Sequence, residues 1–144
     1  MIVNRVKDSD VLLLLQSRDV LHSPWCLIEL EAAITYGVPI VGLLCVGKNY
    51  DVDVAADILL HLETSLEATN AYALEVLKTN NIDPLHLAHK LHSVVPKIVS
   101  IPFDTSASLN TIKAAMADLV MAVHDAKPLL LTESFEEWLL SRNC

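Results

Sequence analysis

A continuous run of apolar residues opens the regular part of the chain, at positions 11–15, and is followed by Gln16. Unbroken hydrophobicity over the length of a strand is typical of a parallel strand that is covered on both faces. Ser23 and Pro24 then provide a helix cap and a proline at the first helical position, which predicts a helix over residues 24–36 that ends at Gly37. A second apolar run at 38–46 completes a strand–helix–strand unit, and such units have right-handed crossovers.

Helical patterns follow this unit. Asp53 is placed to cap one helix, and Asn70 to cap a shorter one that ends near residues 80–81. Asp83 and Pro84 repeat the cap-and-proline signal before a helix that runs to about residue 95. The first of these helices has an apolar stripe made of Val54, Ile58, Leu62 and Leu66.

A third short strand is predicted at residues 98–101, followed by a long amphipathic helix that Ser108 caps. After a linker at 129–133, Ser134 and Glu137 form a capping box for a last helix. We therefore divide the chain into an α/β domain over residues 1–126 and a C-terminal tail over 127–144, whose helix is expected to pack on its own domain. The apolar positions are Leu109, Ile112, Met116, Leu119 and Val123 in the long helix and Phe135, Trp138 and Leu139 in the last one.

The composition fits one folded domain of 144 residues, because 53% of them are hydrophobic and only 19% are charged. A net charge of −8 disfavours binding to nucleic acid. Cys26, Cys45 and Cys144 show neither metal-ligand spacing nor an obvious pairing, which indicates a reducing compartment. No apolar segment approaches the roughly 20 residues of a membrane span. We expect a soluble cytoplasmic protein without a metal, a cofactor, a nucleic-acid partner or a membrane span.

The segment after the first strand carries a motif. A hydrophobic strand that ends at Ser17 is followed by Ser-x-Trp-Cys-x-x-Glu-Leu at the start of a helix, and a Val-Pro-Ile-Val strand lies behind it at 38–41. This arrangement resembles the Toll/interleukin-receptor homology (TIR) family, in the style of TIR-like proteins of algae and other protists. The resemblance is strong over residues 9–46 and extends to about residue 126 in general layout. The motif residues are Ser23, Pro24, Trp25, Cys26, Leu27, Ile28, Glu29 and Leu30.

The resemblance implies a flavodoxin-like α/β fold, with three layers around a parallel sheet. The first two strands of that fold, its first helix and the loop after its second strand have no counterpart here, so we expect about three strands and extra helices. In TIR domains that hydrolyse NAD⁺ the motif glutamate is catalytic, and by position this is Glu29, with Ser23, Trp25 and Cys26 as implied substrate-binding residues. A carboxylate there would stabilise the oxocarbenium ion that forms as the nicotinamide–ribose bond breaks. The pocket of those enzymes is shared with the absent part, so we expect it to be incomplete in this chain.

The same residues have plainer interpretations. Glu29 is also the kind of solvated first-turn glutamate that the positive end of a helix dipole favours. Ser23 is first a helix cap, and Trp25 and Cys26 are typical packing residues. A nucleophilic Cys26 would need a base such as His22 beside it.

Three histidines recur at every third position of one predicted helix, at His86, His89 and His92. Their side-chain directions spread over about 120°, which is broad for a single metal ion. Solvated histidines at a helix edge are the simpler interpretation, and metal binding is the alternative.

Taken together, these patterns predict an intracellular signalling module that associates with other TIR domains, including further copies of itself. One alternative is an NAD⁺ nucleosidase that uses Glu29, and another is an inactive fragment of a longer TIR protein. If the leucine strand at 11–15 lies at a sheet edge, its unpaired backbone groups would be available to another chain and would drive assembly.

Overall fold

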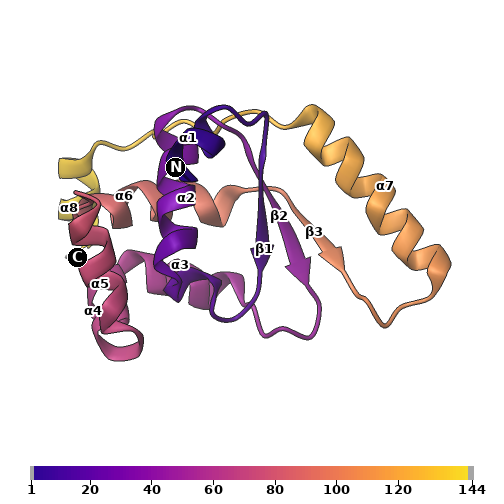
Figure 1. Ribbon diagram of the computed structural model, residues 1–144, viewed down its shortest axis with the longest axis horizontal. Coiled ribbons are helices and arrows are strands. Elements are labelled where there is room, and N and C mark those ends of the chain that lie inside the picture. The colour runs from indigo at the N-terminus through magenta and orange to yellow at the C-terminus, as the bar shows by residue number, and fades with distance from the viewer. Residues whose placement is uncertain (1, 143–144) are drawn as a thin grey trace.

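The computed structural model describes residues 2–142 (Figure 1). Within that range the chain forms a three-stranded parallel sheet and eight α-helices, so the predicted α/β class is confirmed. The strands β1 (Leu12–Gln16), β2 (Ile40–Cys45) and β3 (Ser100–Phe103) lie in the order β1-β2-β3. The leucine strand is therefore at one edge of the sheet.

The helices lie on both faces of the sheet. Figure 1 shows α7 on one side and the other helices gathered on the opposite side. Short 3₁₀ turns at Val20–His22 and Val95–Lys97 lead into α2 and β3. The helices are α1 (Ile2–Lys7), α2 (Pro24–Thr35), α3 (Val52–Leu60), α4 (Leu62–Thr69), α5 (Ala71–Thr79), α6 (Pro84–Val94), α7 (Leu109–Asp125) and α8 (Phe135–Arg142).

The two faces of β1 differ in how far other elements of the fold cover them. Leu14 and Gln16 point toward the large helical layer and are buried, whereas Leu13 and Leu15 on the other face are 43% and 55% exposed. The prediction that this strand is covered on both faces is therefore wrong. The physical reason is that α7, the helix on that face, packs against β3 and β2 at the far side of the sheet.

The core lies between the sheet and the large helical layer. It is aliphatic except for one aromatic side chain, Trp138 of α8, which is 2% exposed. Because α8 packs against α6, the tail helix docks on its own chain, as the sequence predicts. Fully buried leucines from α2 to α6 form the centre, among them Leu27, Leu30, Leu59, Leu62, Leu66, Leu77, Leu87 and Leu91.

Local capping signals predict the starts of four helices correctly. The Ser23 hydroxyl accepts a hydrogen bond from the Cys26 amide at 3.5 Å, and Asp83 caps α6 in the same way. Ser108 accepts from the Thr111 amide at 3.2 Å, and Ser134 accepts from the Glu137 amide at 3.1 Å. Each of these side chains satisfies one of the amide groups that a helix start leaves without a partner.

Two helices after β2 differ from their prediction. Asp51, not Asp53, caps α3 by accepting from the amides of Asp53 and Val54 at 2.8 and 3.1 Å. The helix ends at Leu60 and a new one begins at Leu62, so the apolar face shifts. The predicted stripe member Val54 is 57% exposed, whereas the buried stripe consists of Ala55, Leu59, Leu62 and Leu66.

The long helix α7 forms as predicted, but its apolar stripe is only partly covered. Ile112, Leu119 and Val123 are half-buried, whereas Leu109 and Met116 are 66% and 54% exposed. No residue of α7 is fully buried. The strand before it, β3, starts at Ser100, two residues later than residue 98 of the sequence prediction.

Candidate functional site

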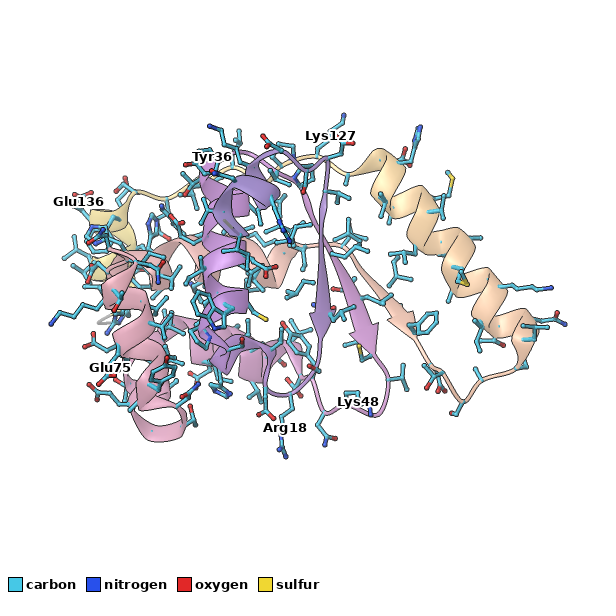
Figure 2. The ribbon with its side chains drawn as sticks, viewed as in Figure 1. Arg18, Tyr36, Lys48, Glu75, Lys127 and Glu136 are labelled. Carbon is cyan, nitrogen blue, oxygen red and sulfur yellow. The ribbon has the colours of Figure 1, made fainter. Side chains whose placement is uncertain are left out.

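The carboxyl ends of β1 and β2 form one rim of the sheet, where parallel α/β folds place their ligands. In Figure 2, Arg18 and Lys48 lie at this end, toward which the strands point. The Arg18 amide donates to the Lys48 carbonyl at 2.9 Å and so holds the two loops together. A surface cavity lies here, lined by Arg18, Asp19, Leu21, His22, Asn49, Tyr50, Asp51, Val54, Ala55 and Ile58.

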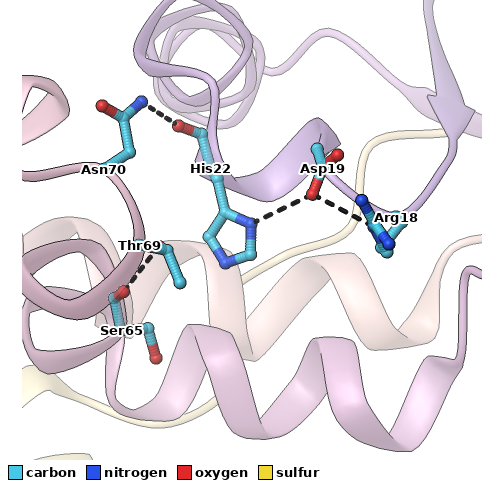
Figure 3. Close-up of polar contacts among 6 residues, drawn as sticks. All are labelled: Arg18, Asp19, His22, Ser65, Thr69 and Asn70. Carbon is cyan, nitrogen blue, oxygen red and sulfur yellow. Dashed lines mark hydrogen bonds and ion pairs between the residues drawn. The ribbon is translucent and has the colours of Figure 1, made fainter.

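Charged side chains of the loop after β1 interact beside this cavity, which we call the rim cavity. One carboxylate oxygen of Asp19 lies 3.5 Å from Arg18 Nε and 3.9 Å from His22 Nδ1 (Figure 3). Both Arg18 and Asp19 are about 70% exposed, so water screens their ion pair and it contributes little to stability. The side-chain amide of Asn70, at the start of α5, donates to the His22 carbonyl at 2.9 Å and so holds this loop against α5. The prediction that the Asn70 side chain caps that helix is wrong, because it makes no hydrogen bond to the first amides of α5.

A buried polar residue lies behind the rim cavity. Gln16, at the end of β1, is 2% exposed, and its Oε1 atom has no hydrogen-bond partner within residues 2–142. Burial raises the pKa of Tyr50, and a hydrogen bond with the Gln16 side chain opposes that increase in part. Gly42 lies beside this amide, since a Cβ atom there would be 2.6 Å from Gln16 Oε1. The sequence pattern did not predict this cluster, although a glutamine at the end of a leucine run is a signal for a buried polar group.

The residues of the TIR-like motif lie on the first two turns of α2. Ser23 caps the helix, and its carbonyl also accepts from the Leu27 amide at 3.0 Å. Trp25 is 49% exposed, and Cys26 is a half-buried free thiol. None of the motif residues Ser23, Trp25, Cys26 and Glu29 lines the rim cavity. Their proposed contacts to a substrate remain a prediction.

Glu29 lies in the second turn of α2, not in the first turn as its plainer interpretation assumes. It is half-buried and one turn beyond Trp25, so these two side chains share a face of the helix. Within residues 2–142 the Glu29 carboxylate makes no side-chain hydrogen bond or ion pair. The neighbouring Glu31, by contrast, forms an ion pair with Lys90 of α6 at 2.8 Å.

The three histidines of α6 hold the tail helix in place. His89 is 7% exposed, and its Nε2 atom lies 2.8 Å from the Glu133 carbonyl. His92 Nδ1 accepts a hydrogen bond from Trp138 Nε1, and the His86 ring stacks on Phe135. The interpretation as solvated histidines is therefore wrong for the buried His89 and the half-buried His92, which α8 covers, whereas the side chain of His86 is 61% exposed.

The exposed edge of the sheet is the second candidate site. Along β1, hydrogen bonds run only to β2, and the opposite edge of the strand has no partner strand within residues 2–142. Together with the exposed Leu13 and Leu15, this gives one strand with both an open backbone edge and an open apolar face. We refer to residues 11–17 with this edge and face as the open strand.

Comparisons with family models, curated proteins and solved structures give no match for this chain. Among residues 2–142, no helix has the length and apolar character that crossing a bilayer requires.

Proposed function

We propose that this chain is a TIR-type signalling module, with a flavodoxin-like sheet, that acts by associating with TIR domains, including copies of itself. The open strand is the observation that carries this proposal. The motif from Ser23 to Glu29 and the strand–helix–strand unit around it supply the family assignment. We infer a cytoplasmic location for such a module, which agrees with free thiols at Cys26 and Cys45.

An unprotected edge of this kind favours association. Sheets that must remain monomeric protect their edges with lysine, proline, bulges or a covering segment. The open strand has no charged residue and no proline between Asp10 and Arg18. A partner strand would bury the exposed leucines and satisfy the backbone groups at the same time, which is how β-strand addition gains affinity.

The face beside the open strand extends this surface. The helix α7, which lies on the same side of the sheet as Leu13 and Leu15, also exposes apolar side chains, including Met116, Val120 and Met121 at 54–66%. Exposed apolar side chains in such numbers favour interaction with a partner when they gather in a patch. A partner placed along β1 would lie against the same face of the sheet.

Sedimentation velocity over a wide range of protein concentration tests the proposal. We expect the average mass to rise with concentration, and Leu13→Ser with Leu15→Ser to suppress that rise. Val54→Ser is the matched control, because Val54 is as exposed as Leu15 but lies on α3, in the helical layer on the other side of the sheet from Leu13 and Leu15. A protein that stays monomeric at all concentrations would contradict the proposal.

Cleavage of NAD⁺ by Glu29 is the alternative function, and it rests on the position of Glu29 in the motif. The rim cavity, where a ligand of this fold class would be expected, is lined by other residues. Self-association is therefore the function that the geometry supports best.

A further inference from the structure

We propose that the open strand binds the same strand of a second copy in antiparallel orientation. The two strands are related by a two-fold axis that runs between the two Leu14 residues, so that Leu14 lies opposite Leu14 of the second copy; we refer to this as the axis at Leu14. This inference rests on the proposed function, because it names the surface through which the module associates with itself. Pairing of two identical strands about a two-fold axis closes a dimer and leaves no further edge of that kind. It would join two three-stranded sheets into one continuous sheet.

The backbone of β1 fixes which residues face outward. The amides of Leu12 and Arg18 donate to the carbonyls of Pro39 and Lys48, so the even-numbered residues direct their backbone groups toward β2. In a parallel ladder these groups alternate along the strand. Leu13 and Leu15 therefore direct their N–H and C=O groups toward the open edge.

This alternation restricts the register of a second copy. In an antiparallel pair, two outward-facing residues opposite each other exchange both hydrogen bonds. With the axis at Leu14, Leu13 lies opposite Leu15 of the second copy, and Val11 lies opposite Ser17. Both pairs consist of outward-facing residues, so the outward N–H and C=O groups of Leu13 and Leu15 all find partners. The Ser17 carbonyl already accepts from the Val20 amide at 3.3 Å, so the second pair adds fewer new hydrogen bonds.

Side chains agree with the same register. Leu13 and Leu15 are exposed on the same face of the sheet, so each would cover its counterpart in the second copy and form a four-leucine cluster across the axis. Moving the axis by one residue along the strand would place Leu15 opposite Val11 and Leu13 opposite itself. The register at Leu14 thus gives the most leucine contact.

Charge complementarity also favours the register with the axis at Leu14 over its neighbours. Asp10 precedes the open strand and Arg18 follows it, and both side chains are exposed. Asp10 lies in a bend two residues before β1, and Arg18 lies in a turn two residues after it. Extended beyond the strand, the register at Leu14 places Asp10 near Arg18 of the second copy, and the symmetry creates this proximity twice. The ion pair of Arg18 with Asp19 in its own chain is solvent-exposed and weak enough to be exchanged.

Charge-swap variants of the full chain test the register. In sedimentation velocity we expect Asp10→Arg and Arg18→Asp each to weaken the dimer by about tenfold or more, since each change places like charges opposite each other twice. The double variant Asp10→Arg with Arg18→Asp should restore the affinity. Near-UV circular dichroism checks that each variant is folded.

A second double variant provides the matched control. Asp8→Arg with Arg18→Asp has the same total charge as the restoring pair, but Asp8 lies opposite Arg18 only if the axis is at Leu13. We expect no restoration from it. Restoration by this variant instead would overturn the register at Leu14.

Hydrogen exchange of the backbone amides tests the strand pairing itself. We expect the amides of Leu13 and Leu15 to become protected as concentration rises, while those of Leu12 and Leu14 are protected at every concentration. If the protein associates but the charge swaps have no effect and Leu13 and Leu15 stay unprotected, this inference fails and the proposed function stands. If the protein does not associate, both fail. Protection of Leu13 and Leu15 in a monomer would overturn the inference by showing that another segment covers the edge.

Discussion

Nε1 of Trp138 donates a hydrogen bond of 3.1 Å to Nδ1 of His92, across 46 positions of sequence. This contact joins α8 to α6, and it requires the His92 ring to carry no proton on Nδ1. Burial lowers the pKa of His92, and the charges of Lys97, His61 and His89 act in the same direction, whereas Glu133 opposes them. The folded state therefore keeps His92 neutral more strongly than the unfolded state does.

The stability that this contact contributes should depend on pH. Because the pKa of His92 is lower in the folded than in the unfolded state, the contribution is complete above about pH 6.5 and is lost as the pH falls below that value. We expect α8 to loosen between pH 7 and pH 5, seen as a change in Trp138 fluorescence in a Trp25→Phe background. His92→Asn keeps an acceptor that does not titrate and should remove most of this change. A pH profile unchanged by His92→Asn would contradict the prediction.

Removal of the Trp138 side chain should destabilise the whole protein and not only its tail. Trp138 is buried in the main core, and truncation of a buried tryptophan to alanine costs about 3–5 kcal/mol. Urea denaturation of Trp138→Ala measures this loss. Trp25→Ala is the matched control, because Trp25 is half exposed, and we expect its effect to be within about 1 kcal/mol.

Substitution of Gly42 should disturb the cluster behind the rim cavity. A Cβ atom at this position would be 2.6 Å from both Gln16 Oε1 and Ser100 Oγ. We expect Gly42→Ala to destabilise the protein by about 1–3 kcal/mol, as overpacking of a core does. Gly37→Ala makes a useful comparison, because it has open space and only the strain of its φ of +68°. A neutral Gly42→Ala would show that the Gln16 side chain moves aside at little cost.

Incubation with NAD⁺ tests the catalytic hypothesis for Glu29. We expect no release of nicotinamide above background, because Glu29 does not line the rim cavity, where a ligand of this fold class would be expected. Chromatography of the reaction measures nicotinamide and ADP-ribose directly. Turnover that Glu29→Gln abolishes, in a variant that remains folded, would establish the enzyme and reverse our preference between the two functions.

Features determined by neighbouring residues were predictable from the sequence. The caps at Ser23, Asp83 and Ser108 act within three residues of themselves, so a short window contains all the information they need. The leucine run at β1 predicts a strand for the same reason. Its open face was not predictable, because a run of leucines is the same whether one or two layers cover it.

Features that depend on distant residues were the ones missed. The histidines of α6 have the same spacing in a solvated helix as in one that α8 covers, and their partners lie more than 40 residues away. The buried Gln16 was missed because its neighbour Gly42 reaches it only through the pairing of β1 with β2. For the candidate site, the sequence places Glu29 on α2 but does not determine whether a cavity accompanies it.

The weak packing of the long helix α7 has a consequence for where a protease first cleaves this protein. A 17-residue helix without a buried residue has little to hold it when the rest of the fold is intact. Limited proteolysis should therefore cut first in the exposed turn at residues 104–108, and the nicked chain should retain its main core, because α7 contributes no residue to it. The nicked chain still carries α7 through its link to the docked α8, but the cut lets α7 separate from the sheet. The tendency of the nicked chain to precipitate would then measure how much aggregation α7 prevents by covering the second face of the sheet.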